Sequence, residues 1–100
     1  MRILARRTLR EWWEAKPSRK DAIEPLEEWY SIAKKAEWQN PAQIKEMIGT
    51  ASILKNGRVV FNIAGNKYRL VVRINSDYGI IYIRFVGTHA EYDKINADEV

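Results

Sequence analysis

The second half of the chain alternates apolar and polar residues with the period of a β-strand. Three such runs occur, at residues 58–63, 67–74 and 80–86. Successive side chains of a strand point to opposite faces of a sheet, so each run predicts a strand with one apolar and one polar face. Short turn segments separate the runs, and we therefore expect three consecutive antiparallel strands.

The turns set the expected register of these strands. A two-residue turn at Gly65–Asn66 is a hairpin signature. It pairs Ile63 with Tyr68, Phe61 with Leu70 and Val59 with Val72 on the apolar face. In the next hairpin, Ile81, Ile83 and Phe85 stay on that face only if the numbers of paired residues add up to an odd number. A slip of one residue would turn these side chains to the other face. We expect the register that places Arg69 opposite Arg84.

The first half shows helical spacing. Thr8 and Glu11 have capping-box spacing, which predicts a helix that stops at Pro17. Ser18 can cap a second helix that either kinks at Pro25 or begins there. Leu26, Trp29, Tyr30 and Ala33 share a face of that helix. The four tryptophans, Trp12, Trp13, Trp29 and Trp38, are expected to pack rather than to stack on bases.

Short elements complete the expected order. Asn40 followed by Pro41 predicts a capped helix that Gly49 ends. Residues 1–4 predict a short edge strand, and Thr88 with Glu91 predicts a capped C-terminal helix. The fold class expected is α+β, a single domain over residues 1–100, with N-terminal helices packed on one face of a small, mainly antiparallel twisted sheet.

Composition narrows the class of protein. Hydrophobic residues make up 46% of the 100 residues, enough for one core. The absence of cysteine excludes disulfides, thiolate nucleophiles and iron–sulfur ligation. The arginine-rich residues 1–10 contain no uninterrupted apolar stretch, so we expect no signal peptide, no membrane span and a cytoplasmic location.

The excess positive charge falls on the predicted sheet. The formal charge is +4. On the polar face, the expected register places Asn62 opposite Arg69 and Arg58 opposite Arg73, with Lys67 at the turn. Like charges directly opposite each other are destabilising, and guanidinium groups match phosphate oxygens, so this face favours an anionic ligand. The alternative is a solvated face whose arginines pair with carboxylates from the helices.

A candidate for proton transfer follows the last strand. His89 and Tyr92 are three residues apart and share one side of the predicted C-terminal helix, close to Arg84. A base, an acid and cations are what phosphodiester transfer in RNA requires. Alternatively, His89 bonds the backbone at the cap and Tyr92 packs on the sheet. With one histidine and no cysteine, we expect no first-row metal site and no cofactor, although Mg²⁺ carried by RNA stays open.

Two long blocks of sequence resemble a HigB-type toxin of the RelE/ParE-like superfamily. They are VVFNIAGNKYRL at 59–70 and YIRFVGTHAEYDK at 82–94, and Trp38, Asn40, Pro41 and the opening RILARR also fit. The resemblance implies a bacterial type II toxin that cleaves messenger RNA, commonly on the ribosome, and a cognate antitoxin. It implies catalytic roles for Arg69, Arg84, His89 and Tyr92, and RNA contacts for Asn62, Lys67 and Lys94.

The residue pattern and the family resemblance together give the expected roles, and two alternatives stay open. Arg69 and Arg84 would neutralise the scissile phosphate, His89 would move a proton, and Tyr92 would orient the substrate, while Arg58 and Arg73 would add RNA contacts. One alternative is a non-catalytic module that holds RNA or an acidic partner. Another is a ParE-like inhibitor of DNA gyrase, although that activity has no evident need for proton-transfer groups.

Overall fold

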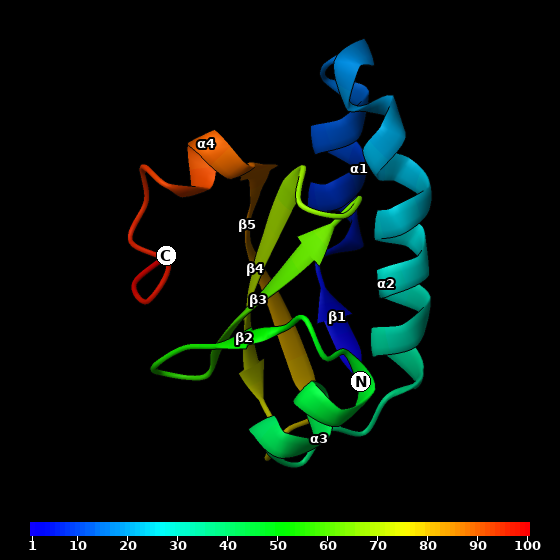
Figure 1. Ribbon diagram of the computed structural model, residues 1–100. Helices are drawn as coiled ribbons and strands as arrows, with labels where there is room; N and C mark the ends of the chain where they lie inside the picture. Colours follow the sequence, from blue (N-terminus) through cyan, green and yellow to red (C-terminus); the bar gives the residue numbers. More distant parts are fainter.

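A computed structural model describes all residues 1–100 as a five-stranded sheet with the two longest helices packed on one face (Figure 1). The chain begins with β1 (Arg2–Leu4), α1 (Arg6–Glu14), the 3-10 helix η1 (Pro17–Ala22) and α2 (Ile23–Lys35). Then come α3 (Pro41–Met47), β2 (Ser52–Ile53), β3 (Arg58–Ile63), β4 (Tyr68–Asn75), β5 (Ile80–Thr88) and α4 (His89–Tyr92). The α+β class is therefore confirmed.

The sheet is mixed, with strand order β1-β5-β4-β3-β2. Only β1 runs parallel to its neighbour, β5, and the other pairings are antiparallel. The predicted edge strand at residues 1–4 is confirmed. The opposite edge strand, β2, was not predicted, because two residues carry no periodic signal.

The first predicted register is confirmed. Val59 pairs with Val72, Phe61 with Leu70 and Ile63 with Tyr68. The same register sets Arg58 opposite Arg73 and Asn62 opposite Arg69. The apolar face of this hairpin is buried, because all six residues of the three apolar pairs are at most 3% exposed.

The predicted register of the second hairpin is wrong. Arg69 pairs with Gly87, not with Arg84, and the register shifts between Val71 and Val72. Val71 pairs with Phe85 and Val72 pairs with Ile83, so Arg84 is the extra residue of a β-bulge. A bulge inverts the alternation of faces beyond it. Ile81 and Ile83 therefore face the helices as predicted, whereas Phe85 lies on the other face.

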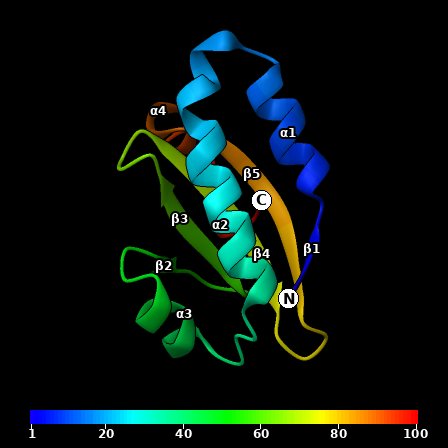
Figure 2. The ribbon, with the colours of Figure 1, turned by 90° about the vertical axis from the view of Figure 1, so that its right-hand side faces the viewer.

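Helices α1 and α2 cover one face of the sheet (Figure 2). Leu26, Trp29 and Ala33 of α2 are buried, as their spacing predicts, and Tyr30 is half-buried beside them. The predicted packing role of the tryptophans is confirmed. Trp13, Trp29 and Trp38 are buried, and Trp12 packs edge-on against Tyr68.

The predicted N-cap residues are confirmed in two of the four helices α1–α4. Asn40 accepts a hydrogen bond from the Gln43 amide, and Thr88 forms a full capping box with Glu91. The predicted Thr8 cap is wrong, because α1 already starts at Arg6, directly after β1. Helix α2 starts at Ile23, so Pro25 neither kinks nor opens it but lies in the first turn, where a missing N–H costs nothing.

The outer face of the sheet, defined here as the face opposite α1 and α2, is covered by α4 and the C-terminal segment, residues 93–100 (Figure 1). Val60 and Val71 lie on this face and are 3% and 0% exposed, although neither belongs to the main core. The outer face therefore has a small apolar centre of its own, with arginines around it.

Candidate functional site

The arginines of the outer face pair with no Asp or Glu side chain. Arg58, Arg69, Arg73 and Arg84 form no ion pair. The carboxylates of α1 and α2 that form ion pairs do so with Arg6, Arg7 and Arg10 on the helical layer. The alternative in which helical carboxylates satisfy these arginines is thus wrong. No Asp or Glu side chain therefore compensates the charge of these four arginines.

Two of these arginines converge on a single oxygen atom. Arg58 donates to the backbone oxygen of Val100 from Nη2 at 2.8 Å and from Nε at 3.2 Å. Arg84 donates to the same oxygen from Nε at 3.1 Å. The bulge gives Arg84 this reach. The pair, called here the arginine clamp, already surrounds one acceptor in the way that guanidinium groups surround a phosphate oxygen.

The C-terminal segment occupies the clamp. Besides Val100, the Asp98 side chain accepts a hydrogen bond from the Lys55 amide at 3.2 Å. Sequence reasoning missed this contact, because residues 93–100 carry no periodic pattern that places them on the sheet. An anionic ligand that binds both arginines has to replace the Val100 oxygen.

Arg69 lies at another place on the same face. Its Nη1 donates to the backbone oxygens of Asn66 and Tyr68, at 3.1 and 3.2 Å. Asn62 donates to the Asn66 side chain at 3.4 Å. Arg69 and Asn62 thus belong to the β3–β4 hairpin end, next to α4, whereas Arg84 joins Arg58. Arg73, opposite Arg58, is exposed and makes no side-chain hydrogen bond.

Helix α4 presents His89 beside the hairpin end. The His89 amide donates to the Lys67 backbone oxygen at 3.2 Å, which ties the start of α4 to the hairpin. The His89 side chain is 54% exposed, and its Nδ1 lies 3.1 Å from an Asp93 carboxylate oxygen. The alternative in which this side chain bonds the backbone is wrong. Its Nε2 makes no hydrogen bond within the protein.

The contact between His89 and Asp93 was not predicted from the sequence, although their spacing indicates it. His89 and Asp93 are four residues apart, and side chains at this spacing meet on a helix. Tyr92 is half-buried on α4, and Lys94 is exposed. No hydrogen bond joins Tyr92 to Arg84 or to His89, so the structure places these groups on one side of the molecule without linking them.

Lys67 is not a free cation, because it pairs with Asp21 of η1. The Asp21 carboxylate accepts hydrogen bonds from Lys67 Nζ and from the Tyr68 hydroxyl, the latter at 2.6 Å. The bond from Lys67, followed by that from Tyr68, lowers the pKa of Asp21. The same contact with Asp21 raises the pKa of Lys67, and burial raises the pKa of Tyr68. This pair fastens the hairpin to the helical layer.

The Asp21→Asn variant is expected to lose stability most clearly at neutral pH. The folded pKa of Asp21 is lower than its ordinary value of 3.8, so the ionised carboxylate stabilises the fold above that pH. This contribution disappears as the pH falls from 3.8 through the lowered folded value. Thermal unfolding measured from about pH 2 to about pH 7 should show that the difference in midpoint between wild type and variant shrinks in acid.

Asp77→Asn provides the matched control, since Asp77 is exposed in a turn and makes no ion pair. An Asp21→Asn midpoint that stays equal to that of wild type at neutral pH would show that the Asp21 contacts add nothing to stability.

The structure contains neither a cluster of metal ligands nor a membrane-spanning helix. No group of three His, Asp or Glu side chains lies close enough to hold a metal ion. None of the helices has the length and apolar character needed to cross a membrane.

The α+β fold with a cationic outer face and an exposed histidine defines a small basic domain with the groups needed to bind an anion and move a proton. Residues 22–95 match the HigB toxin family, described as the RelE-like toxic component of a toxin–antitoxin system. Because the match covers most of the chain, the protein belongs to this family, and its membership implies an antitoxin partner. Comparison with curated proteins gives no match.

Proposed function

We propose that this protein is an mRNA interferase, the toxin of a toxin–antitoxin pair, which cleaves messenger RNA by phosphodiester transfer. The observation that carries the proposal is the arginine clamp, two guanidinium groups that pair with no Asp or Glu side chain and meet at one oxygen atom of Val100. Family membership supports it, since RelE-like toxins generally cleave mRNA. The reaction would take place in the cytoplasm, on mRNA that is bound to the ribosome.

The reaction needs one proton removed and one supplied. A base takes the proton of the RNA 2′-hydroxyl, and the 2′-oxygen attacks the adjacent phosphorus. The bond from phosphorus to the 5′-oxygen breaks, and an acid protonates that oxygen. The products are a 2′,3′-cyclic phosphate and a 5′-hydroxyl. No metal ion or cofactor enters this sequence of steps.

The outer face offers groups that can stabilise the phosphate charge and move a proton. Arg58 and Arg84 hold the phosphate and stabilise the negative charge that grows on it in the transition state. His89 moves a proton through Nε2, because its Nδ1 lies 3.1 Å from Asp93. A carboxylate at Nδ1 orients the imidazole.

Arg69 and Tyr92 complete the proposed catalytic set. Arg69 binds a phosphate from the hairpin end, and Tyr92 orients the substrate. Contacts to the rest of the RNA strand are assigned to Asn62, Lys67, Arg73 and Lys94. Phosphate contacts of this kind position the strand without reading its sequence.

Incubation of the purified protein with a short RNA, with and without programmed ribosomes and in the presence of EDTA, tests the proposal. We expect fragments that end in a 2′,3′-cyclic phosphate and begin with a 5′-hydroxyl. Fragments that appear only after Mg²⁺ is restored would contradict a reaction carried by side chains alone. Intact RNA under all conditions would favour a binding module or a ParE-like action on gyrase.

A further inference from the structure

A second group of cations lies at the hairpin end of the sheet, apart from the arginine clamp. A pocket of about 320 Å³ there is lined by Lys16, Arg19 and Lys67, and by Thr88 at the end of β5. We call it the hairpin-end pocket. Its cations come from two segments far apart in the sequence, the α1–η1 region and the β3–β4 hairpin.

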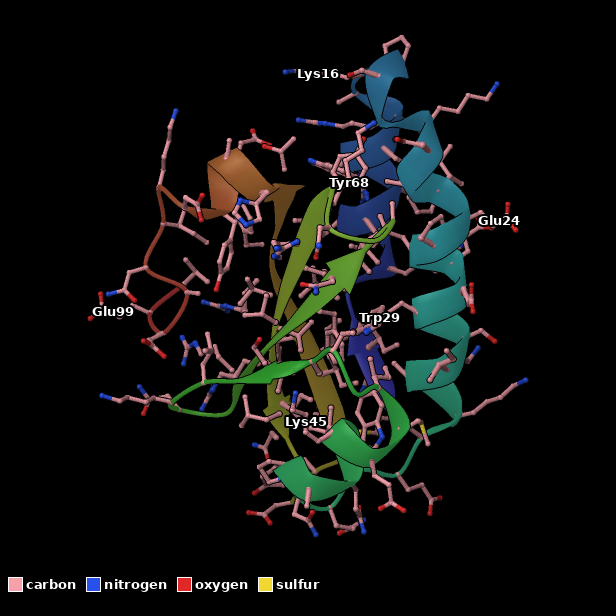
Figure 3. All side chains as sticks on the ribbon, in the orientation of Figure 1. Lys16, Glu24, Trp29, Lys45, Tyr68 and Glu99 are labelled. Carbon is pink, nitrogen blue, oxygen red and sulfur yellow. The ribbon has the colours of Figure 1, made fainter.

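Two of these cations have free hydrogen-bond donors. Lys16 is exposed, makes no ion pair or side-chain hydrogen bond, and extends from the top of the helical layer toward the side on which α4 lies (Figure 3). Arg19 donates from Nη1 to the Trp12 backbone oxygen at 2.9 Å, and its guanidinium lies 4.5 Å from the Trp12 ring centroid. Trp12 thus holds Arg19 in place while its other N–H groups stay free.

The carboxylates around this pocket do not neutralise it. Asp21 pairs with Lys67, and Glu91 is the one carboxylate in the lining. Glu91 accepts from the Thr88 amide at 2.8 Å, so the capping box fixes it against the backbone. The capping hydrogen bonds lower the pKa of Glu91, and the charges of Arg19 and Lys16 add to this effect. Negative charge is therefore favoured where these two cations face the pocket.

We propose that the hairpin-end pocket binds a phosphate group of the RNA strand that flanks the scissile phosphate. The inference rests on the proposed function and adds Lys16 and Arg19 to it as RNA-binding residues. Thr88 lines the pocket and His89 follows it directly, so a strand that passes His89 enters the pocket. The hydroxyl groups of Ser18 and Thr88 lie in the same lining and can donate to phosphate oxygens.

The Lys16→Ala variant of the full-length protein tests this site, with a 2′-O-methyl RNA oligonucleotide as an uncleavable probe. We expect its dissociation constant to rise about three- to tenfold, and the slope of log K against log salt to fall by about 0.7, the value for one phosphate contact in a single strand. In cleavage assays KM should rise while kcat stays unchanged, because the contact is made equally in the ground and transition states. Lys20→Ala, in η1, which starts directly after Lys16, but outside the pocket, should change none of these quantities.

Glu91→Gln gives a result of opposite sign. Glutamine keeps the capping hydrogen bond but removes the negative charge from the lining, so the probe should bind more tightly than to wild type. If Lys16→Ala cleaves and binds like Lys20→Ala while wild type cleaves RNA, the pocket is not an RNA site and the proposed function stands. If wild type neither binds the probe nor cleaves RNA, the proposed function itself fails.

Discussion

Arg84→Ala is expected to lower kcat/KM for RNA cleavage by on the order of 100-fold, the typical cost of removing one donor that stabilises transition-state charge. Arg84 forms one side of the arginine clamp, and its Nε already donates to an oxygen that Arg58 also binds. Alanine removes the charge and every donor at this position. Arg84→Lys keeps the charge but loses the planar fork, so we expect an intermediate rate.

The fold should survive this substitution. Arg84 is exposed, and its side chain makes a single hydrogen bond, so the free energy of unfolding should stay within about 0.5 kcal/mol of wild type. Arg2→Ala is the matched control, because Arg2 is an exposed arginine without an ion pair on β1, the strand next to β5. Single-turnover cleavage assays compare the variants. An Arg84→Ala rate equal to that of Arg2→Ala would remove Arg84 from the catalytic site.

Phe61→Ala is expected to lower the free energy of unfolding by about 3–5 kcal/mol, a large part of the roughly 5–15 kcal/mol that keeps a domain folded. Phe61 is 1% exposed, and its ring lies between two tryptophans, with centroid distances of 5.4 Å to Trp29 and 6.2 Å to Trp38. Alanine leaves a cavity at the point where α2 and the segment before α3 meet the sheet. Urea unfolding measures the loss as a lower midpoint.

Tyr78→Ala removes an aromatic side chain that is 78% exposed, and it should change stability by no more than about 0.5 kcal/mol. The contrast between the two substitutions separates core packing from the general loss of an aromatic ring. Equal midpoints for Phe61→Ala and Tyr78→Ala would mean that the packing of Phe61 against Trp29 and Trp38 does not stabilise the fold.

Much of the fold could be predicted from periodicity. The three strands of the second half follow from alternation, the first hairpin register from the turn at Gly65–Asn66, and the buried face of α2 from helical spacing. The bulge at Arg84 could not be predicted in this way, because no glycine or proline marks it and a shift of register leaves the residue pattern unchanged. The two-residue strand β2 could not be predicted either, because two residues carry no periodic pattern.

The candidate site was predicted less well than the fold, for a physical reason. Charge and spacing show which residues share a face, but the bulge decides which of them meet. It separates Arg84 from Arg69 and brings it to Arg58. The Asp93 partner of His89 followed from helical spacing and could have been found. The contact between Val100 and the clamp is long-range, and no local pattern signals it.

The most direct test of the central claim is inducible expression of wild type and of His89→Ala in bacteria, with growth followed and the 5′ ends of cellular mRNA mapped within minutes of induction. The account predicts growth arrest with new mRNA ends for wild type, and neither for His89→Ala. Arrest with intact mRNA would contradict it in favour of gyrase or another target. Normal growth of cells that hold the folded wild-type protein would contradict it in favour of a module that binds without cleavage.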